Sequence, residues 1–182
     1  MTSSPTHDRS CRERRGTPSV LAALYGLAVA IDRSRIRVKA MLIAPNTVGT
    51  AHALSLNPPT LEHPEGFHRL IGGSVKVGET HHDALLREVG EELGATVDHL
   101  TYLGVAENIF RMNGQLGHEI VFLYAGHLDP EPAPSGATLI ETDGAVVPVV
   151  WRPFDDADIG VPLYPTDAAM WLPQARDGIT LK

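Results

Sequence analysis

The chain has 182 residues, of which 43% are hydrophobic and 20% are charged, and its formal net charge is -7. This composition is that of a globular domain with an extension, and it excludes a chain that is disordered throughout. The negative charge argues against general nucleic-acid binding, because affinity for a phosphate backbone needs clustered lysine and arginine. A local basic pocket for a small anionic substrate is compatible with it.

The chain has one cysteine, Cys11, so no intramolecular disulfide can form. A reducing compartment, and therefore a cytoplasmic location, is the expectation. Cys11 lies in a polar segment, where a catalytic thiol is not expected.

Residues 1–34 are predicted to be a partly flexible N-terminal extension, and residues 35–182 the main domain. The extension contains an apolar run, Val20–Ile31, which is too short to span a bilayer because a membrane helix needs about 20 residues. Charged residues follow it where a secretory signal would have its small-residue cleavage site. We therefore favour a segment packed on the domain or on a second subunit over a secretory signal, with no membrane span and a possible homodimer.

The main domain alternates strand patterns with turn signals, and it contains one strong helix pattern. Proline-rich or glycine-rich stretches separate the predicted strands. A short helical or irregular tail follows the last of them. These elements predict a mixed α/β (α+β) domain of two or three layers. The predicted strands are 35–44, 51–56, 68–75, 100–112, 118–128 and 145–154.

The predicted helix has clear start and stop signals. Thr80 can act as N-cap, with Asp83 at capping-box spacing, and Gly94 follows the last apolar position. Leu86, Val89 and Leu93 recur at helical spacing and are predicted to form its buried stripe.

The same helix carries three clustered glutamates, Glu88, Glu91 and Glu92. At about 100° per residue the three carboxylates share one arc. A solvated acidic face is one explanation. However, the last helical turn disfavours negative charge, and a glycine-bearing loop precedes the helix. Clustered oxygen donors suit hard divalent cations, so a metal site is the other explanation.

These residues belong to a longer pattern that resembles the Nudix box, G-x5-E-x7-R-E-U-x-E-E-x-G-U, where U is a bulky aliphatic residue. The chain supplies Gly73, Glu79 and then Arg87-Glu88-Val89-Gly90-Glu91-Glu92-Leu93-Gly94-Ala95. Every glycine, glutamate and arginine of the pattern is present, and only Ala95 departs from it, at the final aliphatic place.

The resemblance to MutT-like Nudix hydrolases implies an α/β/α sandwich with a mixed β-sheet. It also implies a metal-dependent pyrophosphohydrolase that uses magnesium or manganese (Mg²⁺ or Mn²⁺) and cleaves a nucleoside diphosphate linked to another moiety. In that family the box residues that match Glu88, Glu91 and Glu92 bind the metal, often with the carbonyl that matches Gly73. The counterparts of Glu79 and Arg87 brace the loop against the helix.

This chemistry needs positioning and charge neutralisation more than covalent steps. The metal would neutralise charge and lower the pKa of a water, and a carboxylate would take the water's proton. The resemblance implies a further ligand or base on a nearby strand, and Glu119 is the candidate. A solvent-facing residue at a sheet edge is the alternative for Glu119.

Four residues outside the box are candidate substrate contacts. Arg69 could face a phosphate, Glu107 and Arg111 flank a strand end, and Tyr164 could line a base pocket. Exposed strand positions and a packed turn aromatic are the alternatives for Arg69 and Tyr164.

Sequence markers of the ADP-ribose, dinucleoside polyphosphate and NADH hydrolases of this family are missing, so the particular nucleotide-type substrate stays open. A catalytically silent nucleotide-binding or partner-binding module is the alternative function, and the intact carboxylates count against it. A fold-sharing isomerase of isopentenyl diphosphate would need a better-placed cysteine than Cys11.

Overall fold

The computed structural model describes residues 35–141, 143–155 and 160–178, so the predictions for residues 1–34 lie outside the described residues. The helical elements are α2 (His81–Leu93), the 3-10 helix η1 (Thr166–Trp171) and α3 (Leu172–Gly178). The strands are β1 (Arg37–Pro45), β2 (Ala51–Asn57), β3 (Phe67–Arg69), β4 (Ile71–Ser74), β5 (Thr96–Met112), β6 (Gln115–Asp129), β7 (Ala137–Ile140), β8 (Val146–Pro153) and β9 (Leu163–Tyr164).

In the described part of the chain the strands form one nine-stranded mixed sheet with two halves. One half contains β5, β6, β1 and β4, with β1 parallel to β6 and antiparallel to β4. The other contains β7, β8, β2, β3 and β9. The halves join where β1 pairs with β2, at Ala44 opposite Ala53.

The predicted strand 68–75 divides between these two halves. β3 pairs with β2, and β4 pairs with β1. The break falls at Leu70, whose N–H donates to the Tyr164 carbonyl at 3.1 Å. At Gly72 a Cβ would lie 2.3 Å from the Ala40 carbonyl oxygen, so only glycine lets β4 approach β1 this closely. The division puts Arg69 and Gly73 in different halves although they are four residues apart.

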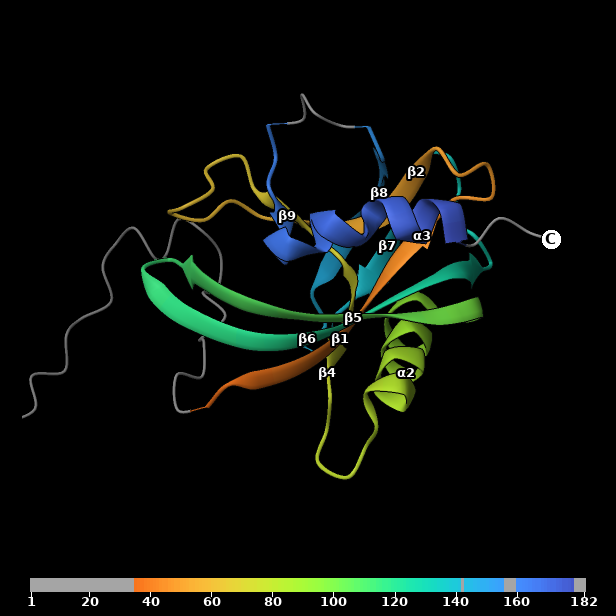
Figure 1. The fold of residues 1–182 in the computed structure, drawn as a ribbon. Coiled ribbons are helices and arrows are strands. Elements are labelled where there is room, and N and C mark those ends of the chain that lie inside the picture. Colours follow the sequence, from red (N-terminus) through yellow and green to blue (C-terminus); the bar gives the residue numbers. More distant parts are fainter. Residues whose placement is uncertain (1–34, 142, 156–159, 179–182) are drawn as a thin grey trace, which may run out of the picture.

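Helices cover the sheet from two sides (Figure 1). α2 contacts β1, β4, β5 and β7, whereas η1 contacts β5 and α3 contacts β1 and β6. The predicted α/β/α sandwich with a mixed sheet is therefore confirmed, and so is the short helical tail. None of the helices in the described residues is long and apolar enough to cross a membrane.

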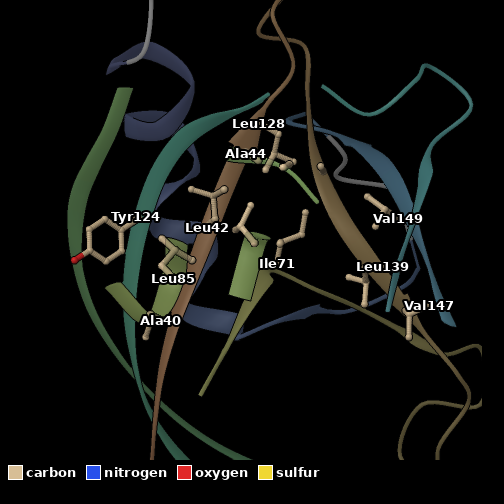
Figure 2. Close-up of a cluster of buried hydrophobic side chains, with 14 residues drawn as sticks. Ala40, Leu42, Ala44, Ile71, Leu85, Tyr124, Leu128, Leu139, Val147 and Val149 are labelled. Carbon is tan, nitrogen blue, oxygen red and sulfur yellow. The ribbon is translucent and has the colours of Figure 1, made fainter. Parts of the chain in front are cut away.

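Two apolar clusters fill the layers on either side of β1. Ala40, Leu42 and Ala44 point into the cluster under α2, which Figure 2 shows. Met41 and Ile43 point to the opposite cluster, under η1 and α3. This alternation follows from the two-residue period of a strand, and it explains why the fully buried β1 reads as continuously apolar.

The predicted ends of α2 are confirmed. The Thr80 hydroxyl accepts from the Asp83 N–H at 3.1 Å, and Gly94 ends the helix with φ 63° while its N–H donates to the Gly90 carbonyl.

The predicted buried stripe of α2 is wrong at Leu86, which is exposed. The buried residues are Ala84, Leu85, Glu88, Val89 and Glu92. Starting at Leu85, the last three follow at i+3, i+4 and i+7, so they share one helix face. The apolar residues that begin at Leu86 have helical spacing, but the buried face of α2 begins one residue earlier and includes Glu88 and Glu92.

The β5–β6 hairpin is longer than predicted. β5 begins at Thr96 and β6 at Gln115, and the turn between them is Asn113–Gly114, with φ of 51° and 75°. Both residues thus adopt the left-handed conformation of a tight hairpin turn. The longer strands carry the hairpin well past α2 (Figure 1).

Candidate active site

A glutamate–arginine pair ties the loop after β4 to α2. Arg87 donates from Nε to Glu79 Oε1 at 2.7 Å and from Nη2 to Glu79 Oε2 at 3.0 Å. Arg87 Nη2 also donates to the Ser74 carbonyl at 3.0 Å, and the Lys76 N–H donates to Glu79 Oε2. The hydrogen bonds from Arg87, then the Lys76 N–H, lower the pKa of Glu79 to about 2. These contacts hold strand, loop and helix in one frame.

The other face of Arg87 meets two of the box carboxylates. Arg87 Nη1 lies 2.9 Å from Glu88 Oε1 and 2.9 Å from Glu91 Oε2. The Glu91 side chain is 55% exposed, so it lies at the rim of the cluster. The sequence pattern placed the three glutamates on one arc, but only Glu88 and Glu92 are buried.

Glu88 packs directly against Gly73. A Cβ at Gly73 would lie 2.2 Å from Glu88 Cδ and 2.5 Å from each carboxylate oxygen. Glu88 is only 5% exposed, so its carboxylate occupies the space that any side chain at position 73 would need. This contact gives Gly73 a steric role in the candidate site.

Glu92 is the most electrostatically perturbed carboxylate of the cluster. It is 8% exposed, and burial raises its pKa to about 8, with further contributions from the charges of Glu141 and Glu88. Arg69 acts in the opposite direction. A buried carboxylate with acidic neighbours is the environment that a bound cation would relieve.

Glu141 is a site residue that the sequence did not reveal. It follows β7, whose Leu139 is buried in the cluster under α2. A turn holds it, because its N–H donates to the Ala145 carbonyl and its carbonyl accepts from the Gly144 N–H. The only signal was an acidic residue at the end of a short unassigned strand, 49 positions after Glu92.

Glu119 is buried rather than solvent-facing, so the alternative given for it is wrong. Its Oε1 lies 2.9 Å from Arg37 Nη2, and its Oε2 accepts from Asn108 Nδ2 at 3.1 Å. Its neighbour Val121 belongs to the cluster under η1 and α3, so Glu119 lies on the opposite face of the sheet from α2. Its assignment as metal ligand or base stays a prediction.

Two cations, Arg69 and Lys39, act electrostatically on the buried charges of the site. Arg69 is close enough to lower the pKa of both Glu92 and Lys39. Lys39, which the sequence did not single out, is only 8% exposed. Burial and then Arg69 lower its pKa to about 8, while Glu119 and Glu88 act in the opposite direction.

Tyr164 and Arg69 lie opposite each other on the parallel strands β9 and β3. The Tyr164 hydroxyl is 2.7 Å from His63 Nε2, and its ring packs edge-on against Phe67. Phe110 is the next ring, and Arg37 lies over it at 5.9 Å. Tyr164 is thus a packed aromatic that also borders the charged residues.

The other two predicted substrate contacts lie elsewhere. Glu107 is 61% exposed and pairs with His118, and Arg111 donates to the Gly114 carbonyl at the hairpin turn. Successive residues of a strand face opposite ways, and Asn108 is the one that faces inward. The sequence predicted where this strand lies, but not which of its residues face inward.

Across the described residues no group of three or more histidine, cysteine, aspartate or glutamate side chains is arranged to hold a metal ion. The donor chemistry nevertheless fits a hard cation. Glu88 and Glu92 are buried oxygen donors whose negative charges repel each other, and Glu141 adds a third nearby charge.

A family model described as the NUDIX domain matches residues 50–174, well over half of the chain. No curated protein matches the chain. Among solved structures, a MutT NUDIX hydrolase from Burkholderia pseudomallei is 26% identical, with a TM-score of 0.56, and the match covers 78% of this chain and 98% of that one. A MutT mutator protein from Bacillus halodurans is 16% identical, with a TM-score of 0.51 and coverage of 78% and 83%, and it supports the fold alone. The box from Gly73 to Ala95 lies inside the matched region, and the chain therefore belongs to the Nudix family as a MutT-like Nudix hydrolase.

Proposed function

We propose that this Nudix hydrolase is a pyrophosphohydrolase that cleaves a nucleoside diphosphate linked to another moiety, with Mg²⁺ or Mn²⁺ and with water as the nucleophile. The observation that carries the proposal is the buried pair Glu88 and Glu92, of which Glu88 packs against Gly73 and contacts the Arg87 of the Arg87–Glu79 brace. Buried carboxylates that repel each other would be stabilised by a bound cation.

Glu88 and Glu92 would hold the cation, with Glu91 at the rim and the Gly73 carbonyl as a further donor. Outside the box, Glu141 is the carboxylate whose charge acts on Glu92, and Glu119 lies on the opposite face of the sheet from α2. When bound, the metal supplies neutralisation of the charge that develops on the phosphoryl oxygens.

The protein's own residues would position the substrate and move a proton. Arg69 would orient a phosphate through its planar guanidinium, which matches phosphate oxygens in two-pronged contacts. A carboxylate oxygen of Glu92 would accept a proton from the attacking water. The new bond joins the water oxygen to phosphorus, and the bridging P–O bond breaks to release the second phosphate-bearing product.

The sequence also predicts a cytoplasmic location and one domain over residues 35–182, preceded by the extension 1–34. The single cysteine supports a reducing compartment. Both remain proposals.

A substrate panel tests the proposed reaction. Nucleoside di- and triphosphates, nucleotide sugars, ADP-ribose and dinucleoside polyphosphates would be incubated with the protein under Mg²⁺, Mn²⁺ or chelator. We expect phosphate-containing products from at least one class, only with metal. Hydrolysis that is as fast in chelator would contradict the metal requirement, and inertness toward every class would contradict the substrate class.

A further inference from the structure

The side of β1 that packs under α2 continues past this helix as an exposed apolar surface. Successive residues of a strand point to opposite faces, so Val38 shares its face with Ala40 and Leu42, which lie in the cluster under α2. Ala40 and Leu42 are fully buried, whereas Val38 is 39% exposed. In the described part of the chain, the start of β1 is therefore left uncovered on the α2 side.

Strand β6 carries the same surface away from β1. Phe122 lies opposite Ala40, and the His81 ring of α2 stacks on the Phe122 ring with a centroid separation of 3.9 Å. Phe122 therefore points to the α2 side. Leu116 and Ile120 are an even number of positions from Phe122 on the same strand, so they point to that side as well.

Strand β5 completes the surface at the edge of this half of the sheet. Val105 lies opposite Phe122, and Ile109 lies opposite His118. Directly opposite residues of an antiparallel pair project to one face, so both apolar residues are on the α2 side. Ile109 is 61% exposed. The distal apolar face is the part of this surface that lies beyond α2 (Figure 1), and it consists of Val38, Val105, Ile109, Leu116, Ile120 and Phe122.

An apolar segment of the same chain ends close to this face. The run Val20–Ile31 contains no charged residue, and it ends four positions before Arg35, where the described residues begin. Contiguous exposed apolar surface on a globular domain marks a place where something binds. A tethered segment has an effective concentration of about 1 mM or more, which favours it over a separate partner.

The run is long enough to cross the face. Val38 follows Ile31 by seven positions, and such a link spans up to about 25 Å when extended. From β1 through β6 to β5 is about 10 Å, because neighbouring strands lie about 5 Å apart. Twelve residues would cover about 18 Å as a helix, which exceeds this width.

The order of residues in the run also suits a sheet face. At about 100° per residue, its large side chains gather on one side of a helix and its small ones on the other. The large side is formed by Leu21, Leu24, Leu27 and Ile31, and the small side by Ala22, Ala23, Gly26 and Ala30. The large side would fill the space over the exposed strand residues.

We propose that the run Val20–Ile31 packs across the distal apolar face of its own domain. The segment would continue the layer of α2 over the β5–β6 hairpin and the start of β1. It would cover Phe122, on which His81 of α2 stacks, and so support the start of the helix that carries the box glutamates.

Disulfide trapping in the full chain tests where the segment lies. In a Cys11→Ser background, a cysteine would replace Leu21, Leu24 or Leu27 in turn, together with Ile109→Cys. Met170→Cys is the control partner, because Met170 is 72% exposed on η1, on the other side of the sheet. A disulfide needs Cα atoms within about 7 Å, so at least one pair with Ile109→Cys should close about tenfold faster than any pair with Met170→Cys. Mass spectrometry before and after reduction would identify the bond within one chain.

Melting temperatures give a second, independent measurement. Ile109→Ser changes a covered residue if the segment is in place, whereas Ile140→Ser changes an isoleucine of β7 that is similarly exposed, at 56%. Ile109→Ser should therefore melt at least about 3 °C below Ile140→Ser. Leu24→Ser should also melt lower than the wild type. Combining it with Ile109→Ser should cost less than the sum of the two, since both remove the same contact.

Either measurement can overturn the proposal. Equal melting temperatures for Ile109→Ser and Ile140→Ser would show that the distal apolar face is open to solvent. Equal trapping rates for Ile109→Cys and Met170→Cys would place the segment elsewhere. Disulfides that form mainly between chains would assign the face to the segment of a second copy.

Discussion

Gly73 shows how a single residue can define this site, because the Glu88 carboxylate occupies the position of its missing side chain. Gly73→Ala should displace Glu88 and lower kcat/KM by about 10- to 100-fold, since small misplacements at a reacting centre are expensive. Gly90→Ala is the control, because its Cβ would meet nothing closer than 3.9 Å. That variant should keep activity and gain up to about 1 kcal/mol of stability as helical glycine is replaced. Equal activities of the two variants would refute the steric role of Gly73.

Glu92 makes the stability of the metal-free protein depend on pH. Its pKa is raised from 4.5 to about 8 in the folded state, by burial and by the charges of Glu141 and Glu88. The unfolded chain therefore releases this proton first, and stability falls as pH rises from 4.5 to about 8. Glu92→Gln should melt several degrees higher than the wild type at pH 8 and nearly equally at pH 4.5, in chelator. Parallel melting curves across this range would contradict the raised pKa.

The box pattern predicted which glutamates gather on α2, because these residues are neighbours in sequence and helix geometry is fixed. It could not predict their burial, since the helix face that meets the sheet depends on tertiary packing. Lys39 lies 49 positions before Glu88 and Glu141 lies 49 positions after Glu92, so only the folded chain brings their charges near these two glutamates. The sequence pattern pointed to Glu107 rather than to its inward-facing neighbour Asn108, because the sequence does not show which of two successive strand residues faces inward.

At the scale of elements, the Arg87–Glu79 brace joins β4, the loop and α2. Glu79→Gln would weaken two charge-assisted contacts and free Arg87 to compete for Glu88 and Glu91. We expect the Mg²⁺ concentration for half-maximal activity to rise about 10- to 100-fold, as is typical for residues that support metal ligands. A titration of activity against Mg²⁺ measures this, and an unchanged midpoint would argue against the brace.

The ends of α2 were predictable because Thr80 and Gly94 act through their own local hydrogen bonds. The division of strand 68–75 was not, because it depends on which partner strand each part meets. Similarly, β7 is a short edge strand that exists through its pairing with β8. Local signals thus set the helix, whereas long-range pairing sets the strand limits.

At the scale of the whole molecule, metal binding should stabilise the fold. A ligand that binds only the folded state adds about 2.7 kcal/mol when present at 100 times its Kd. Mg²⁺ or Mn²⁺ should therefore raise the melting temperature of chelator-treated protein at pH 8. The same ions should have little effect on a Glu88→Gln, Glu92→Gln double variant. Equal shifts for both proteins would place metal binding elsewhere.

The possible homodimer is also a property of the whole molecule. It stays a prediction, because it was inferred from the apolar run Val20–Ile31, which lies outside the described residues. Several apolar residues of β5 and β6 and at or just before the start of β1 are exposed in the described part of the chain: Ile36, Val38, Val105, Ile109 and Leu116. Light scattering of the full chain would give its oligomeric state.

The most direct test of the central claim compares metal-dependent turnover of the wild type with two isosteric variants on the best substrate of the panel. Glu92→Gln should fold and lose about 10²- to 10⁴-fold in kcat, the contribution typical of a positioned acid or base. Glu65→Gln removes the same charge from an exposed residue of the loop before β3 and should keep full activity. Retention of most Mg²⁺-dependent hydrolysis by Glu92→Gln would contradict the assignment of the active site to the buried carboxylates of α2.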